Sequence, residues 1–267
     1  MAEPGTLTID VDDPDYDPAR EAIESHSLIA KFYKYRPPYT RAYFDALAER
    51  LSLTRDSTVL DLCCGRGDLA AGLGAHVGQI QAVDGAPEMI EHAIPVENAK
   101  YHVADVNRAP LDAVGRIDHI FVGAAIHWVE REALTRIITQ NLVPGGAIVV
   151  AHRNLTLASN AAQNALTQLN RQFGDRPVTG DMQGTAKLRA CGFGQVDGIQ
   201  LAQPAACEPG FLFMYQLSKA YYAFYDNALG RRAEYERAFN EAMAPHTQDG
   251  RIPARIANWA WIYRAAP

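Results

Sequence analysis

The sequence has no excess of basic residues, few cysteines and no long apolar run. Its 25 Lys and Arg against 31 Asp and Glu give a formal charge of -6, without any Lys/Arg-rich run, which disfavours a nucleic-acid partner. The four cysteines have no metal-ligand spacing, and the adjacent pair Cys63-Cys64 would form a strained disulfide. We therefore expect reduced thiols, no metal and a cytoplasmic location. The N-terminus lacks the basic start and apolar core of a signal peptide, and no apolar run approaches bilayer length, so we expect no membrane contact.

The composition is that of an ordinary globular protein. The chain has 267 residues, of which 48% are hydrophobic and 21% charged, enough for one large domain with an appended piece. Residues 1–18 carry Pro4, Pro14 and Pro18 among five aspartates, which predicts a mobile acidic tail that ends where a helix begins near Ala19.

Short apolar strands alternate with helical segments along the chain. Expected strands lie at 57–62, 79–83, 101–104, 117–123 and 147–151, with helices at 87–93 and 129–142 and a turn at 142–146. This alternation predicts an α/β fold with a doubly wound, mostly parallel sheet and helices on both faces. Later segments are expected as helices at 158–173 and 185–190 and strands at 195–201 and 255–263. The predicted α/β domain comprises residues 19–205 with 251–267, and an inserted helical substrate cap comprises 206–250.

A glycine-containing turn follows the first strand. That strand ends at Asp61, and the turn with Gly65 and Gly67 offers backbone N–H groups and a helix N-terminus to a ligand. Asp84 ends the second strand 23 positions later, where a carboxylate can accept hydrogen bonds from both ribose hydroxyls. These features predict a nucleoside site at the first switch point of the sheet.

The pattern Gly65-x-Gly67-x-x-Ala70 followed by Asp84 also fits a dinucleotide-binding dehydrogenase. Asp61 disfavours that interpretation because it would repel a pyrophosphate, whereas it can engage the ammonium group of an amino-acid tail. Asp105, after the third strand, can accept from an adenine amino group, and no hydride-transfer constellation follows the fifth strand. The alternative for Asp61 and Asp105 is a helix N-cap, and the alternative for Met89 is plain core packing.

Four segments in order resemble the motifs of class I S-adenosylmethionine-dependent methyltransferases, over nearly the whole chain from about Lys31 to Tyr263. They are 59–67, 82–90, 103–106 and 142–146. The resemblance implies the strand order 3-2-1-4-5-7-6 with the last strand antiparallel, and S-adenosyl-L-methionine as cofactor. It implies that Asp61 and Gly65 line the methionine end and that Asp84 holds the ribose. It also implies that Met89 packs on adenine and that Asp105 and the Val106 amide read the adenine edge. Gly85, within the second segment, and Gly123, at the end of the fourth strand, are further cofactor-binding candidates.

One residue departs from the family pattern: Cys63 replaces the first glycine of the turn. Some family members, including quinone C-methyltransferases, carry a Cys-Cys pair here, so we expect Cys63 to remain part of a working cofactor site. Arg66 is expected to turn to solvent.

The segment after the fourth strand is where this architecture places chemistry, and it contains His127 and Trp128. Together with 35–39 and the ending 259–264, it resembles a subgroup of small-molecule methyltransferases with a His-Trp pair, including trans-aconitate and juvenile hormone acid methyltransferase-like proteins. We expect His127 to orient or deprotonate the acceptor and Trp128 to line the pocket; the alternative is a histidine packed in the core. Arg36 and Tyr39, from the matching first segment, are expected at the cofactor and the acceptor.

Aromatic residues are dense in the predicted cap. Tyr215 and Tyr222 are candidate acceptor contacts, with His152 after the fifth strand as a further polar group, although core packing explains the same aromatic spacing. Arg36, Lys219 and Arg153 are candidate partners for an acceptor carboxylate.

The expected function is methyl transfer to a small organic molecule, foremost at a carboxylate or hydroxyl oxygen, with nitrogen or carbon as alternatives. A second class keeps the cofactor pocket but catalyses a non-methylating reaction such as cyclisation, or only binds a ligand, because one fold hosts many functions. The sequence does not indicate an oligomeric state.

Overall fold

A seven-stranded sheet forms the centre of the fold. The computed structural model describes residues 29–175, 183–219, 228 and 230–265, so the predicted tail 1–18 and the helix start near Ala19 lie outside the described residues. The strand order is β3-β2-β1-β4-β5-β7-β6, with the last strand antiparallel, which confirms the predicted fold class. The strands are β1 (Thr58–Leu62), β2 (Gln79–Asp84), β3 (Ala99–Val103), β4 (Ile117–Gly123), β5 (Leu142–Leu157), β6 (Phe193–Cys207) and β7 (Ile252–Ala265).

The register of the parallel strands brings their carboxyl ends to one edge. Leu62 of β1 pairs with Val83 of β2 on one side and with Val122 of β4 on the other. Asp84 and Gly123, the last residues of β2 and β4, therefore end at the same edge as β1. Ligands of open α/β sheets bind at such an edge, so the fold positions the predicted site residues for one.

The chain forms two compact units. Unit 1 comprises residues 1–36, 155–178 and 204–255, and unit 2 comprises 37–154, 179–203 and 256–267. The segment predicted as a cap, 206–250, belongs to unit 1 and holds the helices α8 (Pro209–Ser218) and α10 (Arg232–Met243) and the short 3-10 helix η4 (Ala244–His246).

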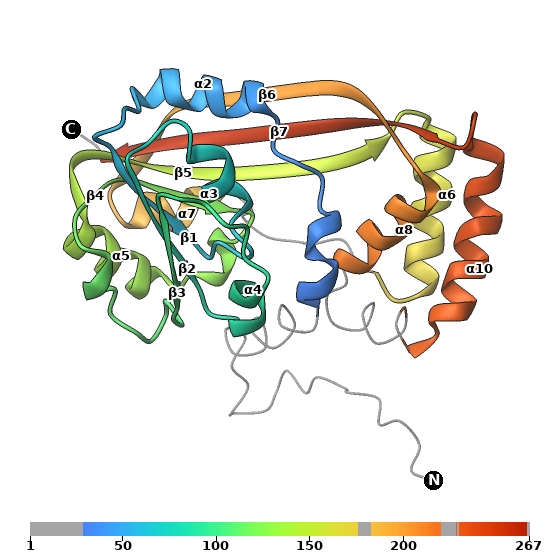
Figure 1. Ribbon diagram of the computed structural model, residues 1–267, viewed down its shortest axis with the longest axis horizontal. Helices are drawn as coiled ribbons and strands as arrows, with labels where there is room; N and C mark the ends of the chain where they lie inside the picture. The colour runs from blue at the N-terminus through green and yellow to red at the C-terminus, as the bar shows by residue number, and fades with distance from the viewer. Residues whose placement is uncertain (1–28, 176–182, 220–227, 229, 266–267) are drawn as a thin grey trace, which may run out of the picture. The chain divides into compact units, whose positions relative to one another are not determined.

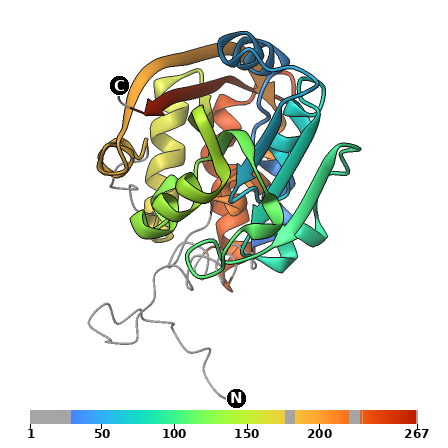
Figure 2. The same ribbon diagram turned by 90° about the vertical axis from the view of Figure 1, so that its left-hand side faces the viewer.

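Helices cover both faces of the sheet of unit 2 (Figure 1, Figure 2), and an apolar cluster lies on each face. Alternate strand residues point to opposite faces, so Leu60 enters one cluster and Val59 the other. The first cluster includes residues of α5 (Arg131–Asn141) and α7 (Thr185–Ala190), and the second those of α2 (Arg41–Leu51) and α3 (Asp68–Leu73). Burial on both faces explains why these strands are apolar throughout rather than alternating.

Unit 1 packs η1 (Ala30–Tyr35), α6 (Asn160–Gln172), α8 and α10 around aromatic rings and a buried polar network. The Tyr235 hydroxyl donates to Asn170 Oδ1 at 2.8 Å, and Asn170 Nδ2 donates to Gln216 Oε1 at 3.0 Å. Because all three side chains are buried, each of these hydrogen bonds satisfies groups that water cannot reach.

Several strands are longer than the sequence predicts. β5 extends from 142 to 157 instead of 147–151, β6 from 193 to 207 instead of 195–201, and β7 from 252 to 265 instead of 255–263. Apolar runs mark only the buried part of a strand, and most of β6 is exposed. The expected turn at 142–146 is an irregularity inside β5, because Leu142 already pairs with Ile117 and the register shifts before Ala147 pairs with His119.

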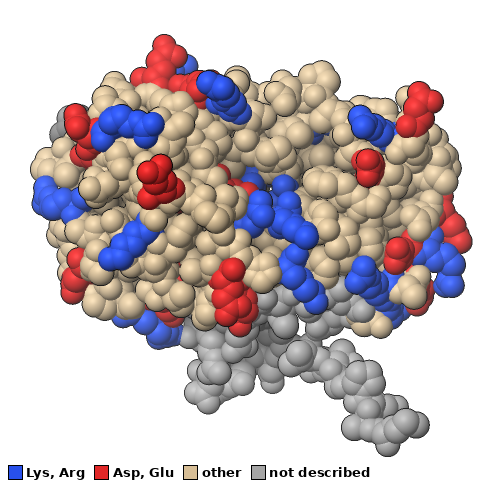
Figure 3. Space-filling view, in the orientation of Figure 1, with Lys and Arg blue, Asp and Glu red and all other residues tan. Residues whose placement is uncertain are grey.

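The surface carries charges of both signs. On the face that Figure 3 shows, basic and acidic side chains are interspersed among larger uncharged areas. Within the described residues, no helix is long and apolar enough to cross a membrane.

Candidate active site

The turn after β1 has three residues in the left-handed region. Cys63 has φ +56°, Gly65 φ +57° and Gly67 φ +81°. Cys63 thus adopts a left-handed conformation that favours glycine, at a strain of about 1–2 kcal/mol for a side chain with a Cβ. Gly67 is required sterically, because a Cβ there would lie 2.3 Å from the Tyr101 hydroxyl oxygen.

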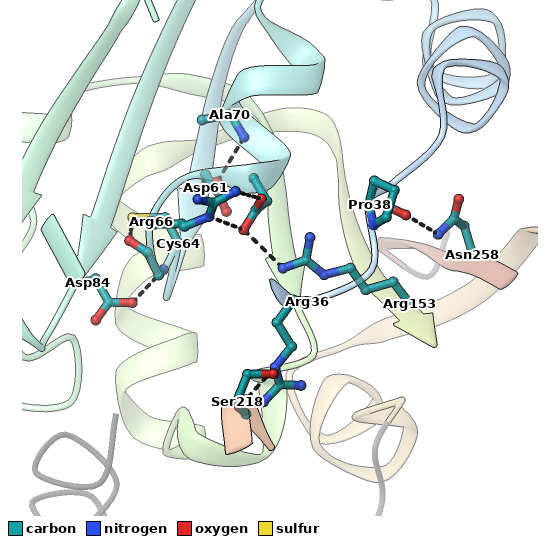
Figure 4. A network of polar contacts seen from close by, with 12 residues as sticks. Arg36, Pro38, Asp61, Cys64, Arg66, Ala70, Asp84, Arg153, Ser218 and Asn258 are labelled. Atoms are coloured by element: carbon teal, nitrogen blue, oxygen red, sulfur yellow. Dashed lines mark hydrogen bonds and ion pairs between the residues drawn. The ribbon is translucent and has the colours of Figure 1, made fainter. Parts of the chain in front are cut away.

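Backbone hydrogen bonds fasten this turn to β2. The Cys64 N–H donates to the Val83 carbonyl at 2.9 Å, and the Gly65 N–H donates to Asp84 Oδ2 at 2.7 Å. The other Asp84 oxygen, Oδ1, accepts from the Ala86 N–H at 2.9 Å (Figure 4 shows Asp84 beside the turn). Both oxygens of the Asp84 carboxylate therefore accept from backbone N–H groups, which fixes this side chain at the carboxyl end of β2.

Asp61 is a buried carboxyl with one oxygen satisfied. Its side chain is 1% exposed, and Oδ2 accepts from the Ala70 N–H in the first turn of α3 at 3.1 Å. Oδ1 has no hydrogen-bond partner among the described residues. Burial raises the pKa of Asp61 to about 8, and nearby Asp68 and Asp84 add to the rise. The N-cap alternative is thus observed for one oxygen, while the other fits a donor with positive charge such as an ammonium group.

Asp68 lies between two guanidinium groups. Arg66 Nη2 is 3.1 Å from Oδ1, and Arg153 Nη2 is 3.0 Å from Oδ2 (Figure 4). Burial alone would raise the pKa of Asp68, but the two arginines outweigh it and lower that pKa. The expectation that Arg66 turns to solvent is wrong, because this ion pair holds its side chain at 23% exposure. Arg153 also stacks over the Tyr39 ring, with its guanidinium carbon 4.8 Å from the centroid.

Asp105 follows β3 and forms a local turn. Its Oδ1 accepts from the Asn107 N–H at 3.0 Å, and Oδ2 lies 3.5 Å from Arg108 Nε. Val106 is buried, and its carbonyl accepts from Arg136 Nη2 at 2.8 Å. Asp105 therefore caps a turn and not a helix, so the helix N-cap alternative is wrong for it, and its contact with adenine stays a prediction.

Gly85 and Met89 follow Asp84 along the chain. Gly85 connects β2 to α4 (Pro87–Glu91), and Met89 of α4 is fully buried. Packing accounts for that burial, so the predicted adenine contact of Met89 remains untested.

The His-Trp pair forms a short 3-10 helix, η3 (Ile126–Trp128), directly after β4. Ala124, which follows Gly123, has φ +54° and donates its N–H to the Ala151 carbonyl of β5 at 2.8 Å. This turn brings the rings of His127 and Trp128 together, with centroids 4.5 Å apart and a 45° angle.

Tyr39 and His152 belong to the same unit as η3. The Tyr39 hydroxyl is 3.3 Å from where a Cβ on Gly123 would lie, so it lies at the end of β4. His152 follows Ala151, the residue paired with Gly123, and its ring centroid is 5.7 Å from that of Trp259.

Three predicted site residues lie in unit 1 or outside the described residues. Arg36 donates from Nε and Nη2 to the Ser218 carbonyl at 3.1 and 2.7 Å, which caps the last residue of α8 (Figure 4). Tyr215 is 2% exposed, with Lys219 Nζ 4.2 Å from its ring centroid. Tyr222 lies outside the described residues. The predicted roles of these three stay predictions.

The cysteines behave as predicted. All four are free, and burial raises the pKa of the Cys63 and Cys64 thiols, with Asp61 and Asp84 adding to the rise. Their thiols are therefore protonated and poor nucleophiles at neutral pH. Across the described residues, no group of three or more His, Cys, Asp or Glu is arranged to hold a metal ion.

Comparison with known proteins identifies the family. A methyltransferase domain profile matches residues 59–146, the region from β1 to the start of β5. An uncharacterized methyltransferase of Mycobacterium tuberculosis is 31% identical over 139 residues, which are 50% of this chain and 68% of that protein. The chain belongs to the methyltransferases. It is S-adenosylmethionine-dependent, and the half-satisfied carboxyl of Asp61 fits that cofactor.

Two further relatives are more distant. An uncharacterized methyltransferase of Schizosaccharomyces pombe is 26% identical over 112 residues, and the match spans 40% of this chain but only 42% of that relative. A solved structure assigned as a type II methyltransferase from Anaeromyxobacter dehalogenans has a TM-score of 0.66 at 18% identity. The likeness covers 86% of this methyltransferase and 97% of that chain, and it establishes the shared fold.

Sequence reasoning missed the partners of the site residues. Arg153 was predicted only as a partner of an acceptor carboxylate, whereas it pairs with Asp68. Asn107 and Lys187, which bond the backbone around His127, were not predicted at all. Their partners are 21 and 61 positions away along the chain, and no spacing signal marks such contacts.

Proposed function

We propose that this methyltransferase transfers a methyl group to an oxygen, of a carboxylate or hydroxyl, on a small organic molecule. The observation that carries the proposal is the turn after β4. There the left-handed Ala124 leads directly into the His127–Trp128 pair, next to the Tyr39 hydroxyl at Gly123. This turn follows the strand beside β1, whose end carries Asp61. It is also the basis of the resemblance to the His-Trp subgroup.

Cofactor-binding roles follow the geometry of unit 2. Asp61 and Gly65 are proposed at the methionine end, supported by the unsatisfied Asp61 Oδ1. Asp84 is proposed at the ribose, supported by its place at the carboxyl end of β2 and by the two backbone hydrogen bonds that fix its carboxylate beside the turn after β1. Further residues are proposed to contact the cofactor on the basis of the sequence motifs alone. They are Cys63, Gly85, Met89, Asp105, Val106, Gly123 and Arg36.

S-adenosylmethionine, when bound, supplies a methyl carbon that leaves from a sulfonium. A lone pair of the acceptor oxygen forms the new C–O bond as the C–S bond breaks, and S-adenosylhomocysteine leaves. For a hydroxyl acceptor, His127 accepts the proton that the oxygen loses; for a carboxylate, no proton moves and His127 orients the acceptor. Trp128, Tyr39 and His152 are proposed to line the acceptor side and exclude water.

The segment 206–250 is proposed to cap the acceptor, with Tyr215 and Tyr222 as aromatic contacts. The support is its sequence pattern and its place in a helical unit. We also infer a cytoplasmic enzyme that acts on a small molecule rather than on nucleic acid, from the net charge of -6 and the free thiols.

The test is a labelled-methyl assay with carboxylic acids, phenols and amines as acceptors. The proposal expects methylated product and an equal amount of S-adenosylhomocysteine. His127→Ala should lower turnover of a hydroxyl acceptor by about 10²- to 10⁴-fold, the usual contribution of a general base, and turnover of a carboxylate by less. The exposed His92 offers a matched control, and His92→Ala should keep wild-type turnover.

Unchanged turnover in His127→Ala on the best acceptor would remove the role of His127. Product labelled only at nitrogen or carbon would replace oxygen as the methylated atom. A rearranged product without consumption of S-adenosylmethionine would favour the non-methylating alternative.

A further inference from the structure

The backbone around His127 is held by a lysine from a distant helix. Lys187 Nζ, on α7, donates to the Ile126 carbonyl at 2.8 Å and also to the Val129 carbonyl. These two carbonyls lie on either side of the His127–Trp128 pair. One ammonium group therefore joins the beginning of η3 to the residue that follows it.

A second side chain holds the same turn from the loop after β3. Asn107 Nδ2 donates to the Trp128 carbonyl at 2.9 Å, and Asn107 Oδ1 accepts from the Glu130 N–H at 2.9 Å. The N–H of Asn107 in turn donates to Asp105 Oδ1. The side-chain amide of Asn107 thus bonds Trp128 of η3 and Glu130 just after it. The backbone of Asn107 is bonded to Asp105, the residue proposed to read adenine.

The position of α7 against η3 is built into the fold. Gly184, the N-cap of α7, has φ +69°, and a Cβ there would lie 2.5 Å from Ile126 Cγ1. At the next position, Thr185 Oγ1 lies 3.0 Å from the Tyr263 hydroxyl of β7. Leu188 is fully buried, so α7 is anchored on both sides of Lys187.

A single turn of 3-10 helix has little stability of its own, since its hydrogen bonds are few and poorly aligned. The hydrogen bonds to the Ile126, Trp128 and Val129 carbonyls therefore contribute to the orientation of His127 and Trp128. We propose that Lys187 and Asn107 are positioning residues for methyl transfer, which fix the His127–Trp128 turn toward the acceptor. This inference rests on the proposed function, in which that turn faces the acceptor.

The test combines kinetics with ¹⁹F NMR of the full-length protein labelled with 5-fluorotryptophan. The chain has three tryptophans, and Trp128→Phe assigns the resonance of Trp128. In Lys187→Met we expect that resonance to shift or broaden while the other two stay in place. We expect kcat to fall about tenfold to a hundredfold, the scale for a misplaced catalytic group, with the Kd of S-adenosylhomocysteine within about twofold of wild type.

The chain offers a matched control and a conservative variant. Arg189 is exposed two positions further along α7, so Arg189→Met removes one cation from the same helix and should change neither the spectrum nor kcat. Lys187→Arg keeps a cationic donor and should recover part of the lost kcat. Asn107→Leu should reproduce the shift of the Trp128 resonance and the loss of kcat.

The outcomes separate this inference from the proposed function. An unmoved Trp128 resonance in both Lys187→Met and Asn107→Leu would overturn the inference. Wild-type kcat in both variants, with an impaired His127→Ala enzyme, would overturn it while leaving the proposed function intact. Wild-type kcat in all three variants would instead remove the role of the turn in catalysis.

Discussion

Replacing the buried Asp61 by asparagine should change how stability depends on pH. In the folded protein the pKa of Asp61 is raised to about 8 by burial, against an ordinary value of 3.8 for an exposed carboxyl. Between these values the unfolded chain releases a proton that the folded chain keeps. The contribution of Asp61 to stability is therefore fully present below pH 3.8 and is lost progressively as pH rises toward about 8.

The slope in this window is about 1.4 kcal/mol per pH unit. The asparagine side chain cannot titrate, so the free energy of unfolding of Asp61→Asn relative to wild type should rise by up to about 3 kcal/mol between pH 5 and pH 7. Urea denaturation of both proteins at pH 5, 6 and 7, with equal m-values as a check, measures the difference. The difference is informative because groups that titrate in both proteins cancel.

Asp68 supplies a control, because its pKa shift has the opposite direction to that of Asp61. Its pKa is lowered in the folded state, so it is ionised in both states above pH 5. The stability difference between Asp68→Asn and wild type should therefore change much less over the same range, with a small change toward pH 7 because Asp68 adds to the raised pKa of Asp61. Saturating S-adenosylhomocysteine should flatten the wild-type slope, because an ammonium group near Asp61 favours its ionised form. An Asp61→Asn difference that does not change from pH 5 to pH 7 would refute the reasoning.

Two further predictions concern stability, one through packing at Gly67 and one through a buried hydrogen bond of Tyr235. Gly67→Ala should lower the free energy of unfolding by more than Gly145→Ala, because both glycines have φ +81° but only Gly67 has a neighbour within 4 Å of the added Cβ. Backbone strain alone costs about 1–2 kcal/mol and the clash with Tyr101 adds about 1–3; equal losses in chemical denaturation would contradict the close contact. Tyr235→Phe should cost about 1–3 kcal/mol, since it removes the donor to the buried Asn170 Oδ1. An unchanged melting curve would show that this hydrogen bond does not contribute to stability.

The sheet could be predicted because its signals are local. Each central strand of unit 2 is a buried apolar run, and the motif segments occur in the order that the family requires. The strand ends were harder to predict, because backbone pairing continues in β5, β6 and β7 where side chains are exposed or polar. The sequence shows where a strand is buried, because buried positions are apolar. The limits of a strand are set by backbone hydrogen bonds, which continue beyond the buried residues.

At the site, residue types were predictable and partners were not. The Asp61 carboxyl at the end of β1 indicated a nucleoside site or a helix cap, but nothing in the sequence indicated that Oδ2 would accept from the Ala70 N–H while Oδ1 stays without a partner. Arg66 was misjudged because its ion pair with Asp68 depends on the bend of the turn. The left-handed conformation of Cys63 could be inferred only from the glycine that it replaces.

The ribose role proposed for Asp84, together with its two backbone hydrogen bonds, has a consequence for engineering the enzyme's cofactor preference. Its two oxygens accept from the Gly65 and Ala86 amides. A smaller residue, introduced to admit a cofactor analogue with a bulkier ribose, would leave the Gly65 and Ala86 amides without their acceptor. The turn after β1, which the analogue must also contact, would then be less rigid. Selectivity for an altered ribose therefore cannot be redesigned at this position alone. It needs a compensating acceptor for each amide, so workable variants should arise as coupled substitutions rather than single ones.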